Sequence, residues 1–293
     1  MKYLHLFIAA FVLWMSSCTP DPISVEIPVA PVLPTVAAQF YYDTITEQSA
    51  LLIVLSKSFA PHLKRTVGVD SNGLAMDTGL LIGNAKVKVN IAGVTYLCEE
   101  AEKGFYYLWN ISLSDFQSCI LDVKDQWGNT LITAQTLAMP SIRFSSLYLS
   151  YHLGNRYLHY TIKGIPGKNW YLVNYLTQQK ADTAVNYQDP AYIARQLTEQ
   201  KLSFDLYTDA DFTQGQLTVK KYLGNAGFDT VAVAVSRITE TYFQFLKAQK
   251  NYGKFINQVK GEVVYFPSNI QGGYGFFSMH QPKVEVLVAD DTN

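Results

Sequence analysis

Residues 85–91 read Ala-Lys-Val-Lys-Val-Asn-Ile, so apolar side chains alternate with polar ones along this segment. Successive side chains of a β-strand point to opposite faces of a sheet, and a period of two is typical of a strand with one buried face. The segment therefore predicts a half-buried strand, and the chain on either side of it follows the same plan.

Short strands separated by turn residues are expected throughout the first half of the chain. They are Ala50–Leu55, Val94–Cys98, Phe105–Trp109, Ile120–Val123 and Thr130–Ala134, the last two flanking a Gly-containing loop. Strands that recur about every ten residues are typical of β-sandwiches. We therefore expect an immunoglobulin-like or transthyretin-like β-sandwich over residues 39–140.

A second β-rich subdomain is expected over residues 141–288. Its predicted strands are Tyr157–Ile162, Trp170–Leu176, Gln216–Tyr222 and Thr230–Ile238, the first two forming a hairpin across Gly164–Gly167. The fold class is thus mainly β.

One or two short helices are expected in this second subdomain. Asp189 and Pro190 predict a helix start before Ala191–Leu197, because Asp caps a helix and Pro suits its first turn. A further helix is predicted from about Thr239 to Lys250, where aromatic residues recur at helical spacing.

Composition agrees with a β-rich fold and excludes one class of partner. Aromatic residues make up 14% of the 293 residues, and they include 20 Tyr, a residue type favoured in strands. The chain has 23 Lys and Arg against 24 Asp and Glu, with no long run of one sign. The electrostatic footprint of a nucleic-acid-binding protein is therefore absent.

The N-terminus has the pattern of an export signal. The uncharged apolar run Tyr3–Met15 follows Lys2, and it is shorter than the about 20 residues that span a bilayer. It predicts a signal peptide over residues 1–17 rather than a buried helix. The Pro-rich stretch 18–38 predicts an extended tether.

Ser16-Ser17 before Cys18 resembles the lipobox of bacterial lipoproteins. This resemblance implies cleavage before Cys18 and acylation of that residue, by palmitate or similar chains, which anchors the chain without a transmembrane helix. We expect a lipid-anchored protein of the outer membrane. Asp21 and Glu26 are too few to decide whether the body faces the periplasm or the cell surface.

Two cysteines remain after Cys18. Exported proteins are in a compartment that permits disulfides, and Cys98 and Cys119 form an even number. If their strands are neighbours the two sulfurs could join. The alternative is two buried free thiols, since Cys also packs as a small apolar side chain.

The stretch Phe266–Phe277 carries a resemblance to a known family. The residues concerned are Ser268, Asn269, Ile270, Gly272, Gly273, Gly275 and Phe276. They resemble the C-terminal signature of Bacteroidota outer-membrane lipoproteins known as domain-of-unknown-function family four-two-four-nine. Looser matches are Ala85–Val89, Thr133–Pro140, Tyr207–Gly215 and Thr241–Leu246. The paired Cys and the short tail 289–293 depart from that pattern.

Because that family commonly accompanies TonB-dependent transporters, the resemblance implies an accessory lipoprotein role, and no enzymatic activity comes with it. We therefore expect a protein that is not an enzyme. The partners expected are the outer membrane, a TonB-dependent transporter and a glycan or peptide ligand. One alternative is a surface adhesin that binds glycans or proteins without a transporter. Another is a hydrolase whose site is assembled by the fold.

Motifs that carry chemistry are scarce. Gln271–Gly275 lacks the Gly-Lys-Ser/Thr of a phosphate loop, so its glycines are expected to serve tight turns. The four histidines after the signal lack metal-ligand spacing, and no Gly-x-Ser-x-Gly occurs. Asp205, Asp209 and Asp211 form either a cation site or a solvated acidic turn. No catalytic residue, metal site or cofactor is therefore assigned.

Four tyrosines are candidates for a binding groove. Tyr148, Tyr151, Tyr157 and Tyr160 could line a groove for a glycan or a peptide, or they could pack within a sheet.

Overall fold

The computed structural model describes residues 33–43, 48–58, 67–69, 75–77, 80–178, 203–225, 228, 230–252 and 266–288. The expected signal peptide, Cys18, the helix at 191–197 and the tail 289–293 lie outside these ranges. The described residues all belong to one compact unit.

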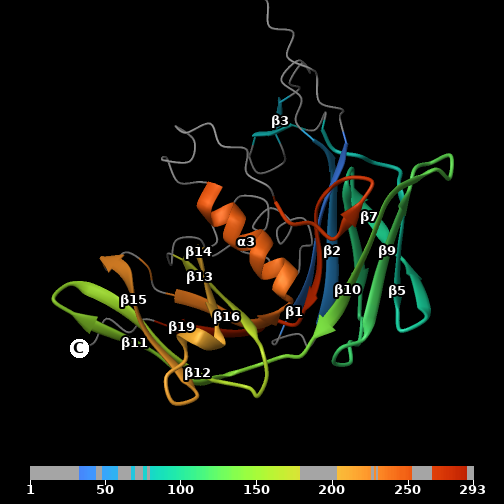
Figure 1. Cartoon of the computed structure of the whole chain (residues 1–293). Helices are drawn as coiled ribbons and strands as arrows, with labels where there is room; N and C mark the ends of the chain where they lie inside the picture. The colour runs from blue at the N-terminus through green and yellow to red at the C-terminus, as the bar shows by residue number, and fades with distance from the viewer. Residues whose placement is uncertain are drawn as a thin grey trace, which may run out of the picture. The chain divides into compact units, whose positions relative to one another are not determined.

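Ten strands form a large mixed sheet (Figure 1). They are β1 (Pro34–Asp43), β2 (Gln48–Lys57), β5 (Lys86–Ile91), β6 (Val94–Leu97), β7 (Glu99–Glu102), β8 (Phe105–Trp109), β9 (Ser118–Lys124), β10 (Thr130–Met139), β17 (Ile270–Gln271) and β18 (Tyr274–His280). Strands β3 (Val67–Val69) and β4 (Ala75–Asp77) form a separate pair.

Two smaller antiparallel sheets follow. The three-stranded sheet holds β11 (Phe144–His152), β12 (Asn155–Lys163) and β15 (Gln216–Asn225). The four-stranded sheet holds β13 (Trp170–Gln178), β14 (Ser203–Thr208), β16 (Thr230–Ile238) and β19 (Lys283–Val288). The helical elements of the described residues are η1 (Asp209–Asp211) and α3 (Glu240–Tyr252).

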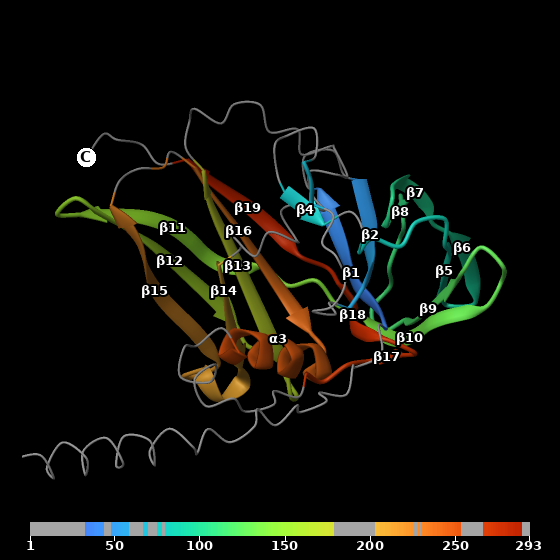
Figure 2. The same ribbon diagram turned by 90° about the horizontal axis from the view of Figure 1, so that it is seen from above.

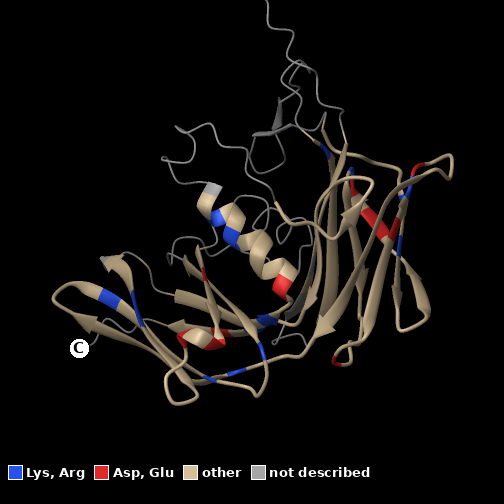
Figure 3. Cartoon of the chain, in the orientation of Figure 1, with Lys and Arg blue, Asp and Glu red and all other residues tan. Residues whose placement is uncertain are grey.

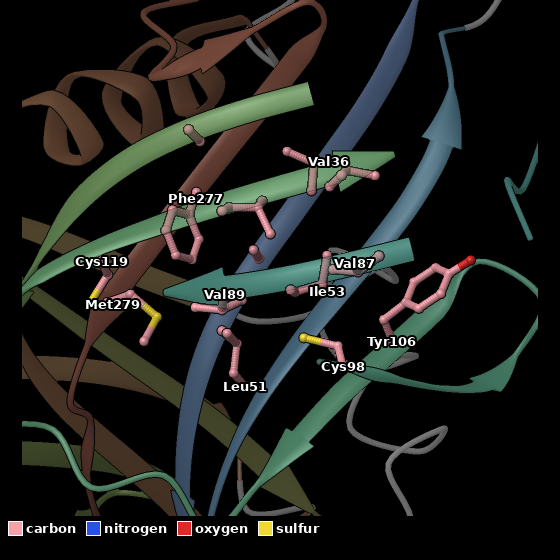
Figure 4. Close-up of a cluster of buried hydrophobic side chains, with 14 of the residues drawn as sticks. Val36, Leu51, Ile53, Val87, Val89, Cys98, Tyr106, Cys119, Phe277 and Met279 are labelled. Atoms are coloured by element: carbon pink, nitrogen blue, oxygen red, sulfur yellow. The ribbon is translucent and has the colours of Figure 1, made fainter. Parts of the chain in front are cut away.

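The large sheet is nearly closed and barrel-like around one apolar core. Its order is β6-β5-β9-β10-β18-β1-β2-β8-β7, and β6 and β7, at its two ends, are separated along the chain by Cys98 alone. Val87 and Val89 from one half share a buried cluster with Leu51 and Ile53 from the other (Figure 4). The fold is thus mainly β as expected, but one continuous sheet takes the place of the expected two-sheet sandwich.

Strand β18 is the reason for this difference. It runs parallel to β1 along Tyr274–Ser278 and parallel to β10 at Met279 and His280, so it joins two halves that would otherwise be separate sheets. The C-terminal segment therefore belongs to the large sheet, and 141–288 is not one contiguous subdomain. Strand β1 begins at Pro34, so residues 34–38 of the expected tether belong to a strand.

The two smaller sheets face each other across a second core (Figure 2). Leu158 and Ile162 of β12 meet Val173 of β13 and Val233 of β16 in this core. Helix α3 lies on the other side of the four-stranded sheet, where Phe243 and Leu246 pack on its side chains (Figure 1). It confirms the helix expected from Thr239.

The hairpin expected across Gly164–Gly167 is wrong. Strand β12 pairs with β11 and β15, whereas β13 pairs with β14 and β16, so this loop carries the chain from one sheet to the facing one. The Asn169 amide holds the loop by donating to the Ile165 and Gly167 carbonyls at 2.8 and 3.0 Å.

Candidate functional site

The outer side of the three-stranded sheet carries exposed aromatic side chains. On β12, Tyr157 and His159 alternate with the buried Leu158 and Tyr160, so the former point away from the core. Strand pairing sets neighbours from β11 and β15 beside them. We call this surface the aromatic face; its rows are Ser150–Tyr157–Tyr222, Tyr148–His159–Lys220 and Ser146–Thr161–Thr218.

Ring contacts order the centre of the aromatic face. The Tyr148 ring is stacked on the His159 ring with centroids 4.6 Å apart and planes 3° apart. His159 Nε2 lies 2.7 Å from Ser150 Oγ. Desolvation, with a smaller contribution from Lys220, lowers the pKa of His159, which favours a neutral ring at neutral pH.

The second group of rings lies beside the first. Tyr157 and Tyr222 have centroids 5.6 Å apart, and Lys220 Nζ lies 4.4 Å from the centroid of Tyr157. Tyr148 and Tyr222 are 53% and 54% exposed, so half of each large side chain meets solvent. Such rings bury apolar area readily when a partner arrives.

The aromatic face is free of acidic side chains. Strands β11, β12 and β15 contain no Asp or Glu, and Figure 3 shows blue but no red segments along them. Lys163 and Lys220 point outward with the aromatic residues. The face therefore combines apolar rings, hydroxyl groups and positive charge.

The four candidate tyrosines do not line a common groove. Tyr160 is buried on the inner side, where its hydroxyl lies 2.7 Å from that of Tyr207. Tyr151 pairs with Arg156 in register and so belongs to the side opposite Tyr148. Of these four tyrosines, only Tyr148 and Tyr157 lie on the aromatic face, because side chains alternate along each strand.

Sequence reasoning missed several members of the aromatic face, among them His159, Lys220 and Tyr222. The signal available was the alternation Tyr157, His159, Thr161, but the partners on β11 and β15 depend on strand pairing.

The signature stretch Phe266–Phe277 fixes β18 in the large sheet. The Asn269 amide donates to the carbonyls of Gln135 on β10 and Phe277 on β18, at 3.0 and 2.8 Å, and its oxygen accepts from Phe277 N–H at 3.0 Å. Ser268 Oγ donates to the Gly275 carbonyl at 2.8 Å. These bonds hold the entering chain against the strand that follows it.

The glycines of the stretch permit close backbone approach. Gly275 has a φ of 106°, and a Cβ there would collide with the Val36 carbonyl oxygen on β1. At Gly273 a Cβ would collide with the Pro34 carbonyl. Gly272, with a φ of 85°, faces the Leu131 carbonyl in the same way. These residues are structural.

Comparison with known protein families supports the resemblance that this signature stretch carries. The sequence matches the family described as Domain of unknown function (DUF4249) over residues 45–285. The chain belongs to this family. No curated protein matches its sequence. The match to the DUF4249 family confirms the resemblance seen at Ser268–Phe276, whose role in this chain is to build the large sheet.

The three aspartates of the DUF4249 chain do not gather into a cation site. Asp205 pairs with Lys221 at 2.7 Å and with Lys250 at 3.3 Å. Asp209 accepts from Asn169 N–H at 2.5 Å, and Asp211 accepts from Thr208 N–H at 2.7 Å. Within the described ranges, no three His, Cys, Asp or Glu side chains are placed to hold a metal ion.

A buried Ser–His pair lies on β18. Ser278 Oγ is 2.9 Å from His280 Nδ1, and the two residues are 2% and 0% exposed. A nucleophile at this depth is closed to a substrate. The pair joins the large sheet to α3, because the Tyr242 ring is stacked on the His280 ring with centroids 5.5 Å apart.

Cys98 and Cys119 are free, buried thiols, which is the second of the two alternatives considered. Cys98 N–H donates to the Val87 carbonyl, whereas Cys119 lies opposite Ile91. Four residues along β5 separate these positions by about 13 Å, and a disulfide needs Cα atoms within about 7 Å. Burial raises the pKa of Cys98 to about 12 and that of Cys119 to about 11.

Among the described residues, no helix combines the length and the apolar character needed to cross a membrane.

Proposed function

We propose that this protein is a binding module of the cell envelope, without chemistry of its own, and that the aromatic face is its ligand surface. One observation carries the proposal: the inner side of the three-stranded sheet packs on the second core apart from Tyr151 near its end, while its outer side leaves the rings of Tyr148 and Tyr222 half exposed beside other rings. Rings exposed together on one surface are typical of an interaction site.

The setting of this module is part of the proposal. The lipobox-like stretch before Cys18 supports a lipid anchor in the outer membrane. The resemblance to lipoproteins that accompany TonB-dependent transporters supports an accessory role beside such a transporter. In this role the aromatic face holds a ligand for the transporter. The transporter itself contacts another surface of the protein.

The non-enzymatic assignment draws on two serine–histidine pairs. Ser278 and His280 are buried, and the partly buried Ser150–His159 pair has no carboxylate of the described residues bonded to its imidazole. A catalytic histidine is ordinarily oriented by such a third group. The stacked Tyr148 ring makes His159 part of a contact surface instead.

The test is gentle extraction from native outer membranes in mild detergent, followed by mass spectrometry of what accompanies the protein. It compares wild type, a face variant (Tyr148→Ser, Tyr157→Ser, Tyr222→Ser) and a control variant, Tyr96→Ser, which alters an exposed tyrosine of β6. A TonB-dependent transporter is expected at near-stoichiometric yield with all three.

Wild type recovered alone, with the transporters left in the wash, would contradict the accessory role and favour an independent adhesin. Loss of the transporter from the face variant alone would show that the aromatic face is the transporter contact, which would contradict its role as ligand surface.

A further inference from the structure

The chemistry of the aromatic face restricts the ligand class that it fits. Tyr157 and Tyr222 lie side by side on the outer sheet surface, with Tyr148 two strands away from Tyr222. The face of an aromatic ring carries partial negative charge and attracts the partly positive C–H groups of a sugar ring. Tyrosine rings on a sheet therefore form a platform on which sugar rings can stack.

Hydroxyl groups border this platform. Thr161 and Thr218 form an exposed hydroxyl pair with oxygens 3.3 Å apart, and Ser146 continues the same row. Each hydroxyl can both donate and accept a hydrogen bond. Such groups match the many hydroxyls of a saccharide better than they match a purely apolar surface.

Charge narrows the class further. Lys220 has its ammonium over the Tyr157 ring, and no carboxylate of the described residues pairs with it. With no acid on β11, β12 or β15, an anionic ligand on this sheet meets the positive charge of Lys220 and no carboxylate of these three strands. The charge complementarity therefore selects a ligand with acidic groups.

The geometry separates a polysaccharide from two other ligand classes. The platform is the side of a three-stranded sheet, whereas small metabolites are usually enclosed in concave pockets. An extended peptide gains affinity by main-chain pairing at a sheet edge, and the rings lie on the sheet surface instead. A chain of sugar units can lie across such a surface.

From these observations we infer that the aromatic face binds an acidic polysaccharide, with a sugar ring on Tyr222 and an acidic group at Lys220, whose ammonium lies over the neighbouring Tyr157 ring. This inference rests on the proposed function, because it names the ligand of that surface.

The experiment measures dissociation constants by isothermal titration calorimetry. The acidic probes are polygalacturonate, alginate, hyaluronan and chondroitin sulfate; the neutral probes are dextran and laminarin; poly-glutamate represents an acidic peptide. At least one acidic polysaccharide is expected to bind wild type and the Tyr96→Ser control equally. Binding should weaken as NaCl is raised, because salt screens the attraction at Lys220.

Variants of the aromatic face assign the binding to its residues. Tyr222→Ala is expected to weaken binding about tenfold, the scale of loss when a stacking ring is removed. Tyr157→Ala should also weaken binding, because it removes the ring that lies under the Lys220 ammonium. Lys220→Gln should weaken binding of the acidic polysaccharide, so that the protein no longer binds it more tightly than dextran. Circular dichroism melting curves that match wild type would show that these outward substitutions leave the fold intact.

Failure to bind any of the four acidic polysaccharides, or equal binding by wild type and the face variant, would overturn the inference. Poly-glutamate bound by wild type and lost in the face variant would also overturn it, while supporting the aromatic face as ligand surface. Absence of binding to every probe, together with wild type extracted without a transporter, would remove the proposed function as well.

Discussion

Two outer sheet surfaces of this protein differ although both consist of antiparallel strands. On β5 and β9 of the large sheet, Lys88 lies opposite Asp122, which is also 4.0 Å from Lys124. Lys86 lies opposite Lys124, but the Asp122 carboxylate beside these lysines offsets part of their charge. The aromatic face has rings, hydroxyls and lysines but no acid. The comparison teaches that the side chains of a surface, rather than its strand geometry, distinguish a binding surface, because both surfaces consist of antiparallel strands.

The largest effect is expected at the closure of the large sheet. Gly275→Ala should cost more than about 4 kcal/mol of unfolding free energy, because its Cβ would collide with the Val36 carbonyl at a φ of 106°. Urea denaturation measures it. Gly128→Ala is the matched control, with a φ of 92° but open space around the Cβ, and should cost about 1 to 2 kcal/mol. Equal losses at the two glycines would contradict the role given to β18.

Two tyrosines on β12 test the difference between the inner and outer sides of the three-stranded sheet. Tyr160→Ser removes a fully buried ring and should cost about 3 to 5 kcal/mol, whereas Tyr157→Ser on the aromatic face should cost less than about 1 kcal/mol. Both free energies of unfolding are measured by chemical denaturation under the same buffer conditions, relative to wild type. A large loss at Tyr157 would mean that this ring serves the fold rather than a ligand.

An intermediate effect is expected from pH at the joint between the large sheet and α3. Burial lowers the pKa of His280 from 6.5 to about 4, beside Ser278 and the Tyr242 ring. Between these values the unfolded chain binds more protons. The free energy of unfolding should therefore fall by up to about 3 kcal/mol as pH drops from 6.5 towards 4. His280→Gln should reduce this slope, and His152→Gln, at an exposed site on β11, should keep it.

A slope unchanged in His280→Gln would show that other groups cause the acid sensitivity. Measurement of unfolding midpoints across this pH range, in wild type and both variants, decides between the two.

The smallest effect is expected from reduction. Because Cys98 and Cys119 are free thiols, dithiothreitol should change the melting temperature by no more than experimental error. Both thiols should react slowly with a thiol reagent until the chain unfolds, since burial keeps them protonated and covered. A clear drop in stability on reduction would contradict the strand positions of the two cysteines.

The sequence predicted local structure well where a single strand carries its own signal. The alternation at 85–91 became β5, and the apolar run at 50–55 became part of β2. Such patterns state which side of a strand is buried, but not which strand lies beside it.

What could not be predicted depends on pairing between distant segments. Phe276 and Phe277 were seen as part of a motif, but the sequence does not reveal that their strand fits between β1 and β10. The same limit hid the separation of Cys98 from Cys119, whereas the opposite orientations of Tyr157 and Tyr160 follow from the alternation along β12 alone. The aromatic face itself needs Lys220 and Tyr222 from β15, about sixty residues along the chain from their partners on β12.

Hydroxyl-radical footprinting tests most directly whether the aromatic face is a binding surface. The oxidation of Tyr148 and Tyr222 would be measured by mass spectrometry in intact cells and in the purified body, with Tyr96 as reference. We predict strong oxidation of both tyrosines in the purified protein and protection in cells, relative to Tyr96. Equal oxidation of Tyr148 and Tyr222 in the two samples would contradict the assignment of this face to a ligand.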